Sequence, residues 1–192
     1  MRSILLIHGW GGSGPGHWQN WLSDDQAASG RPVDYPALPD ENTPNLDIWL
    51  ATLRSVRMCQ ERPPDVVAHS LGAIAVIHWL FRETGAGLFN RVLLVSPPSP
   101  RNAAPEVASF FPLPCDITNT VGSNCASITL IGAKDDPFAR PKDFGAIAQI
   151  VGVEPHLFAT GGYLNPESGY GPWPWIAAWA TGEDGGDPRP RE

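Results

Sequence analysis

Short apolar runs alternate along the chain with longer segments whose apolar residues recur at helical spacing. Each run is continuous, which is typical of strands buried on both faces; the runs lie at residues 3–7, 65–69, 91–96, 127–131 and 155–160. The spacing between them predicts helices at residues 17–28, 44–59, 71–83, 144–151 and 172–180. Strands that alternate with helices in this way predict an α/β fold, a mostly parallel sheet with helices on both faces.

The remaining segments organise the chain around this pattern. Residues 31–38 predict a short extended piece interrupted by proline, and residues 97–126 predict a long connection rich in Pro, Ser and Asn. A chain of 192 residues suits one domain, which we expect to span residues 1–181. Residues 182–192 contain Gly, Pro and charge without a large apolar side chain, so we expect a disordered tail.

Composition narrows the functional classes. The formal charge is −7 and no basic run stands out, which argues against nucleic acid and anionic membranes as partners. The first apolar run is too short for a signal peptide or a membrane span. The three cysteines, Cys59, Cys115 and Cys125, lack metal-ligand spacing and predict reduced thiols in the cytoplasm. A local disulfide between Cys115 and Cys125 remains open, and we expect no metal or cofactor.

The segment Ala68-His69-Ser70-Leu71-Gly72 lies between a predicted strand and a predicted helix. A nucleophile elbow places serine on such a turn, with small residues two positions before and after it to relieve crowding. The motif predicts Ser70 as a nucleophile and the Leu71 N–H as an oxyanion donor. A serine that only caps the following helix is the alternative. We expect His69 to be structural, because its place on the turn directs it away from the nucleophile.

A glycine-rich loop, residues 8–14, follows the first predicted strand. In a sheet of this kind such a loop supplies the second oxyanion N–H, which we assign to Trp10, with Gly11 as the other candidate. The spacing of the glycines fits neither a dinucleotide fingerprint nor a phosphate-binding P-loop. His8 and His17 are expected to hold the loop by hydrogen bonds.

A carboxylate after the fourth long strand completes the pattern. Asp135 and Asp136 follow residues 127–131, and we favour Asp136, beside Pro137, as the group that would orient a catalytic histidine. The order serine, then aspartate, then histidine is the one expected along a chain of this type.

These motifs resemble the small, lidless serine hydrolases of the retinoblastoma-binding protein 9 family, within the α/β-hydrolase superfamily. The resemblance covers about residues 3–180, and its markers are His8–Gly12, Gly16–Trp18, Ala68–Gly72, Asp135–Phe138, Asn165–Gly169 and Gly171–Pro174. It implies an α/β-hydrolase fold without a large lid domain. In that family a final block opens Gly-His-Ile/Leu-Asn, and its histidine is the base. The matching residues here are Gly162-Tyr163-Leu164-Asn165, so Tyr163 occupies the base position.

The tyrosine makes the predicted triad incomplete. A phenol has a pKa near 10 and is a poor base at neutral pH. His156 is predicted to lie too far from Ser70 to replace the base, and His78, two turns into the following helix, is predicted to pack or to face solvent. The sequence therefore predicts a serine esterase-type enzyme, acting on a carboxylic ester, thioester or related carbonyl metabolite, with weak or altered activity. A lyase or cyclase, a catalytically silent binding protein, and a variant residue in an active hydrolase are the alternatives.

Eight tryptophans are many for this length. Several fall in loops at the expected catalytic edge and suggest an apolar cleft for a small-molecule substrate with an apolar or aromatic part. The residues predicted to line this cleft are His8, Gly9, Trp18, His69 and Trp173. The sequence leaves the oligomeric state open.

Overall fold

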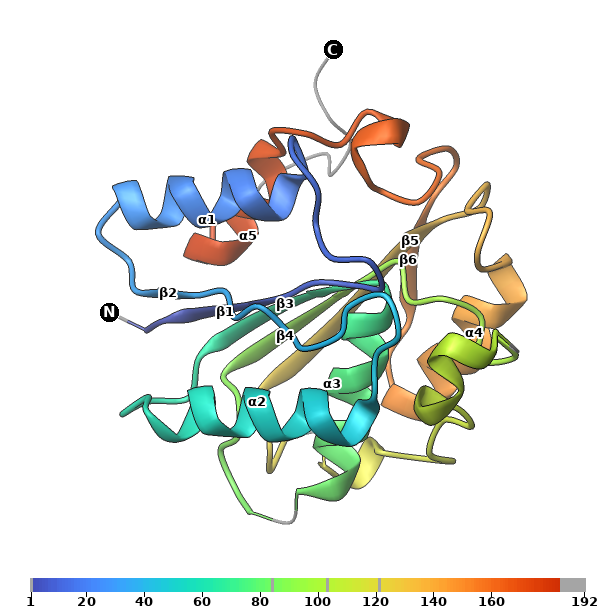
Figure 1. Ribbon diagram of the computed structural model, residues 1–192, viewed down its shortest axis with the longest axis horizontal. Helices are drawn as coiled ribbons and strands as arrows, with labels where there is room; N and C mark the ends of the chain where they lie inside the picture. Colours follow the sequence, from blue (N-terminus) through green and yellow to red (C-terminus); the bar gives the residue numbers. More distant parts are fainter. Residues whose placement is uncertain (1, 84, 103, 121, 184–192) are drawn as a thin grey trace.

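The computed structural model describes residues 2–83, 85–102, 104–120 and 122–183, and its centre is a parallel β-sheet (Figure 1). Neighbouring strands run in the order β2-β1-β3-β4-β5-β6, and every pairing is parallel. The strands are β1 (Ile4–Ile7), β2 (Val33–Asp34), β3 (Asp65–His69), β4 (Arg91–Val95), β5 (Ser127–Ala133) and β6 (Pro155–Phe158). Their carboxyl ends therefore share one edge of the sheet, where ligands bind in folds of this kind.

Helices cover both faces of the sheet. One face carries α1 (Trp18–Ala28) and α5 (Pro174–Thr181); the other carries α2 (Leu46–Met58), α3 (Leu71–Arg82) and α4 (Pro141–Val151) (Figure 1). Two apolar layers result, because each strand buries side chains against the helices above and below it. The predicted α/β architecture is confirmed.

Several boundaries differ from the sequence pattern for local reasons. Helix α4 begins three residues earlier than predicted, because Pro141 suits a first helical turn and the Asp143 carboxylate accepts the N–H of Arg140 at 3.0 Å. The connection at 97–126 contains two 3₁₀ helices, η1 (Pro105–Phe110) and η2 (Thr118–Thr120), which its composition did not indicate.

Helix α5 ends at Gly182, where the predicted disordered tail begins. Gly182 ends α5 with a φ of 82°, a left-handed conformation that glycine adopts without strain. Residues 184–192, on which most of the disorder prediction rests, lie outside the described residues.

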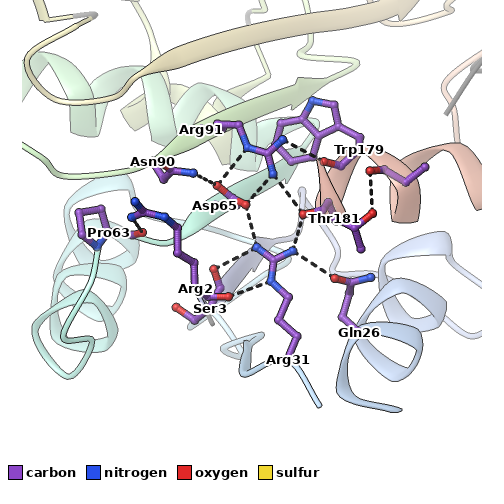
Figure 2. A network of polar contacts seen from close by, with 12 residues as sticks. Arg2, Ser3, Gln26, Arg31, Pro63, Asp65, Asn90, Arg91, Trp179 and Thr181 are labelled. Atoms are coloured by element: carbon purple, nitrogen blue, oxygen red, sulfur yellow. Dashed lines mark hydrogen bonds and ion pairs between the residues drawn. The ribbon is translucent and has the colours of Figure 1, made fainter. Parts of the chain in front are cut away.

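A polar network closes the edge of the sheet opposite the carboxyl ends (Figure 2). The buried Asp65 carboxylate, on the first residue of β3, accepts hydrogen bonds from Arg31 at 2.8 Å, Arg91 at 2.7 Å and Asn90 at 2.6 Å. Both guanidinium groups also donate to the Ala180 carbonyl oxygen at the end of α5. Asp65 thus fixes two arginines that hold the last helix against the sheet.

Two remaining expectations concern the whole chain. All three cysteines are free, so the disulfide left open for Cys115 and Cys125 is absent. Within the described part of the chain, no helix combines the length and the apolar character that crossing a bilayer would require.

Candidate active site

Ser70 lies on a sharp turn between β3 and α3. Its backbone has φ 56° and ψ −125°, a region that non-glycine residues rarely occupy. The side chain does not cap α3, so the alternative of a simple capping serine is wrong. Gly72 allows the turn to lie against β1, because a Cβ there would be 2.4 Å from the His8 carbonyl oxygen. The backbone strain and the close packing both present the Ser70 hydroxyl at the catalytic edge.

The loop after β1 lies directly against Ser70. A Cβ on Gly9 would be 2.6 Å from the Cβ of Ser70, so glycine is required for this approach. The Gly11 N–H donates to the Glu41 carbonyl oxygen at 2.9 Å and is therefore occupied. Among the described residues, no acceptor is recorded for the N–H groups of Trp10 and Leu71. The geometry thus favours Trp10 over Gly11 as the second oxyanion donor.

The loop that carries Tyr163 is anchored through its backbone. Asp135 accepts hydrogen bonds from the N–H groups of Gly161 and Gly162, both at 2.9 Å. The N–H of Tyr163 donates to Ser168 Oγ at 3.1 Å. Asp135, the carboxylate that the sequence analysis ranked second, therefore shapes the loop.

Further contacts fix the same loop from the opposite side. The indole N–H of Trp18 donates to the Leu164 carbonyl oxygen at 2.7 Å. His69 Nε2 donates to the carbonyl oxygen of Tyr163 at 3.1 Å. His69 thus has the structural contact that the sequence analysis expected, and it acts on Tyr163 rather than on Ser70.

The Tyr163 side chain reaches the nucleophile position. Its hydroxyl forms a hydrogen bond with Ser70 Oγ. The phenol ring lies between His69 and Phe138, with ring centroids 4.9 Å and 4.4 Å away. Burial, with the nearby Asp136 carboxylate, raises the pKa of Tyr163 well above its usual value. The hydroxyl therefore stays protonated at neutral pH.

Asp136 is buried beside this pair without joining it. One carboxylate oxygen, Oδ1, accepts the N–H of Phe138 at 2.8 Å, whereas Oδ2 is buried and has no hydrogen-bond partner in the described part of the chain. Burial raises the pKa of Asp136 to about 6. The nearby Ser96 hydroxyl has the opposite, smaller effect on this pKa, although its distance and angle do not meet the criteria for a hydrogen bond. No hydrogen bond between Asp136 and Tyr163 is recorded within the described residues.

His8 holds the first loop by hydrogen bonds, as predicted, whereas the recorded side-chain hydrogen bond of His17 is to the start of α1. His8 Nδ1 donates to the Gly9 carbonyl oxygen at 2.8 Å, and its Nε2 accepts the N–H of Leu38 at 3.2 Å. His17 Nδ1 accepts the N–H of Gln19 at 3.1 Å and caps α1. His8 therefore uses both ring nitrogens in backbone contacts, whereas the recorded contact of His17 uses Nδ1.

The two histidines considered as replacement bases lie in other surroundings. His78 is buried in α3 and bonds the Phe110 carbonyl oxygen at 2.9 Å. His156 is exposed on β6. Neither is among the recorded hydrogen-bond partners of Ser70, whose hydroxyl meets Tyr163.

A cleft of about 370 Å³ opens above Ser70. It lies between the loop after β1 and the Tyr163 loop, and its lining residues are Gly9, Trp10, Gly12, Gly14, Pro15, His17, His69, Ser70, Tyr163, Asn165, Pro166 and Glu167. The predicted lining by Gly9 and His69 agrees with this set, whereas His8 is buried behind it.

Three predicted lining residues are wrong: His8, which is buried, and two tryptophans. Trp18 and Trp173 have no exposed surface and pack edge to face in the core, with ring centroids 5.5 Å apart. Their position in edge loops suggested exposure, but large aromatic rings gain most by burial. The sequence analysis missed Pro166 and Glu167 as lining residues, although the block that contains them follows the base position directly.

The chemistry of the site rests on hydroxyl, carboxyl and backbone groups. In the part of the chain that the structure describes, no group of three or more His, Cys, Asp or Glu residues could hold a metal ion.

Three features define an α/β-hydrolase fold. They are a parallel sheet with a strained serine directly after β3, a carboxylate after β5, and a loop from the last strand that lies over the serine. The solved structure of the ydeN gene product from B. subtilis shares this fold, with a TM-score of 0.81 and 23% identity over 95% of this chain and 98% of that one. Residues 4–180 match the serine hydrolase family, and the chain belongs to that family.

A sequence comparison and a second fold comparison give further similarities. The Bacillus subtilis protein YdeN is 25% identical over 172 residues, which cover 88% of this chain and 89% of YdeN. The structure of the thioesterase domain from the curacin biosynthetic pathway has a TM-score of 0.66 at 14% identity, covering 95% of this chain and 91% of that one.

Proposed function

We propose that this chain is a serine hydrolase of carboxylic esters, thioesters or related carbonyl compounds, with Ser70 as its nucleophile. The observation that carries the proposal is the strained backbone of Ser70, whose hydroxyl is directed away from capping α3 and into the cleft. Within the family, the sequence markers favour the retinoblastoma-binding protein 9 subfamily. The free cysteines support a reducing compartment, the cytoplasm.

In this proposal, Ser70 Oγ attacks the substrate carbonyl carbon, and the N–H groups of Trp10 and Leu71 stabilise the resulting oxyanion. The proton of Ser70 has no imidazole to receive it. Tyr163 stays protonated, because its raised pKa keeps the phenolate out of reach at neutral pH. Water in the cleft must take the proton, so turnover is slow compared with that of a complete triad.

The charges around the cleft select against anionic substrates. Among the described residues that line it there is no lysine or arginine, whereas Glu167 is one of them, and the Glu41 carboxylate lies against Gly12 at the rim. Trp10 and Phe138 expose 43% and 56% of their surface at this edge. A neutral ester or thioester with an apolar or aromatic part fits these surroundings best.

A lyase or cyclase is a second candidate, which the Ser70–Tyr163 contact favours. A protonated phenol beside two free N–H groups suits polarisation of a carbonyl oxygen, without formation of an acyl-enzyme. Such chemistry would need Tyr163 as a proton donor and would not consume Ser70.

The test is covalent labelling of the native chain with a fluorophosphonate, together with turnover of p-nitrophenyl acetate. We expect labelling on Ser70 and slow turnover, with both lost in Ser70→Ala and both retained in Ser29→Ala, a surface control. Absence of labelling and of Ser70-dependent turnover would reject the hydrolase. A catalytically silent binding protein or non-hydrolytic chemistry would then remain.

A further inference from the structure

His17 lies in the same cleft as Ser70, and its ring is oriented by one backbone contact. Nδ1 accepts the N–H of Gln19 at the start of α1, so it carries no hydrogen. A neutral imidazole with a bare Nδ1 bears its hydrogen on Nε2. The helix cap thereby sets the tautomer of His17.

The Nε2–H of His17 has no recorded acceptor within the described residues. The residue is only 6% exposed, yet it is part of the cleft lining. Its neighbour His69 lies 5.0 Å away between ring centroids, and no hydrogen bond between the two rings is recorded among the described residues. His17 Nε2 is not among the fully buried atoms that lack a partner in the described part of the chain, so its N–H is accessible from the cleft, where a ligand is placed to accept its hydrogen bond.

Burial, with the two neighbouring imidazoles His69 and His8, lowers the pKa of His17 to about 3. The ring is therefore neutral across the physiological range. It contributes directional hydrogen bonding without attracting anions, which agrees with the absence of cationic side chains from the cleft lining.

We propose that His17 is a specificity-determining residue whose Nε2–H donates a hydrogen bond to an oxygen of the bound substrate, other than the oxygen of the reacting carbonyl. The inference rests on the proposed function. It assigns the substrate to neutral carbonyl compounds that carry a second hydrogen-bond acceptor, such as an ether, hydroxyl or carbonyl oxygen. His17 is not a replacement base, because its one lone pair is occupied by the helix cap.

The experiment uses pairs of esters of equal shape in which an ether oxygen replaces a methylene group. Native chain and His17→Asn are compared on p-nitrophenyl butyrate and p-nitrophenyl methoxyacetate, and on p-nitrophenyl pentanoate and p-nitrophenyl 3-methoxypropanoate. Asparagine retains an oxygen that caps α1 and removes the ring N–H. In at least one of the two pairs, we expect His17→Asn to raise the KM of the ether ester about 3- to 10-fold relative to the KM of its matched alkyl ester.

A second measurement is independent of turnover. Methoxyacetone and 2-pentanone have the same shape and are not hydrolysed, and their Kd values are read from the ¹H–¹⁵N signal of the His17 ring by NMR titration. We expect tighter binding of methoxyacetone and a shifted Nε2–H signal. His156→Asn, a change at an exposed histidine, serves as the control and should match the native chain.

The outcomes separate the two proposals. Loss of Ser70-dependent hydrolysis with retained preference for methoxyacetone would reject the hydrolase and keep the role of His17. Equal effects of His17→Asn on ether and alkyl compounds in both measurements would overturn the role of His17, as would absence of ketone binding together with absence of an ether preference in turnover.

Discussion

The hydroxyl groups of Ser70 and Tyr163 share a hydrogen bond at the base of the cleft. In a complete triad the group in contact with the nucleophile is an imidazole, which takes up the serine proton and becomes a cation. The Tyr163 phenol makes the same contact but does not take up the serine proton, because burial raises its pKa and keeps its own proton in place. The predictions below follow from this pair and from the groups that position it.

We expect Tyr163→His to increase p-nitrophenyl acetate turnover by about 10²- to 10⁴-fold, the usual contribution of a general base. The loop backbone is held by Asp135, Trp18 and Ser168, so the new ring should enter the same space. Combining Tyr163→His with Asp136→Asn should remove most of the gain. An inactive Tyr163→His chain that remains folded by circular dichroism would contradict the assignment of position 163 as the base position.

Asp136 should make stability depend on pH. Its pKa rises from 3.8 to about 6 on folding, so the protonated form is favoured in the folded chain. This contribution is fully present below pH 3.8 and is lost as the pH rises through about 6. At pH 7.5, Asp136→Asn should therefore have a higher urea midpoint than the native chain, with a free energy of unfolding larger by up to about 3 kcal/mol. At pH 4 the two urea midpoints should be similar.

The control for this pH series is Asp24→Asn, on an exposed position of α1. It should follow the native profile of urea midpoint against pH. A constant difference between Asp136→Asn and the native chain from pH 4 to pH 8 would show that titration of Asp136 is not the cause.

Gly9→Ala should block the site while leaving the fold intact. The added methyl group would lie 2.6 Å from the Cβ of Ser70, so either the loop or the nucleophile must move. We expect fluorophosphonate labelling of Ser70 to slow at least about 10-fold, since misplacement of a reacting group is costly. Gly14→Ala is the matched control in the same loop, because its Cβ would meet nothing within 4 Å. Equal labelling of the two variants would count against the close approach of Gly9 to Ser70.

Asp65→Asn should be strongly destabilising, by about 3–5 kcal/mol in urea unfolding, because the Arg31 charge would remain buried without a carboxylate. Asp47→Asn, which breaks the exposed pair with Arg82, should cost no more than about 1 kcal/mol. Hydrogen bonds from Arg91 and its neighbours lower the pKa of Asp65 despite its burial, so the contribution of Asp65 is present above pH 3.8 and is lost as the pH falls below it. A flat stability profile below pH 4 in the native chain would contradict this.

The sequence predicted those parts of the molecule that local pattern controls. The strands and helices follow apolar periodicity, and β3 agrees residue for residue because its turn to α3 requires small neighbours. Exposure of single aromatic residues was predicted less well, since Trp18 and Trp173 lie beside loops at the starts of predicted helices but are buried in the core. The tautomer of His17 also escaped prediction, because it depends on a hydrogen bond that only the folded start of α1 supplies.

The anchoring of the loop that contains Tyr163 has a consequence for how this site changes over time. Asp135, Ser168 and Trp18 hold backbone atoms of that loop, and none of these bonds uses the side chain at position 163. The backbone conformation of the loop is therefore expected to stay the same when the side chain at position 163 is exchanged. Since tyrosine and histidine codons differ by a single base, one mutation is enough to exchange the side chain that faces Ser70 while these backbone contacts are kept.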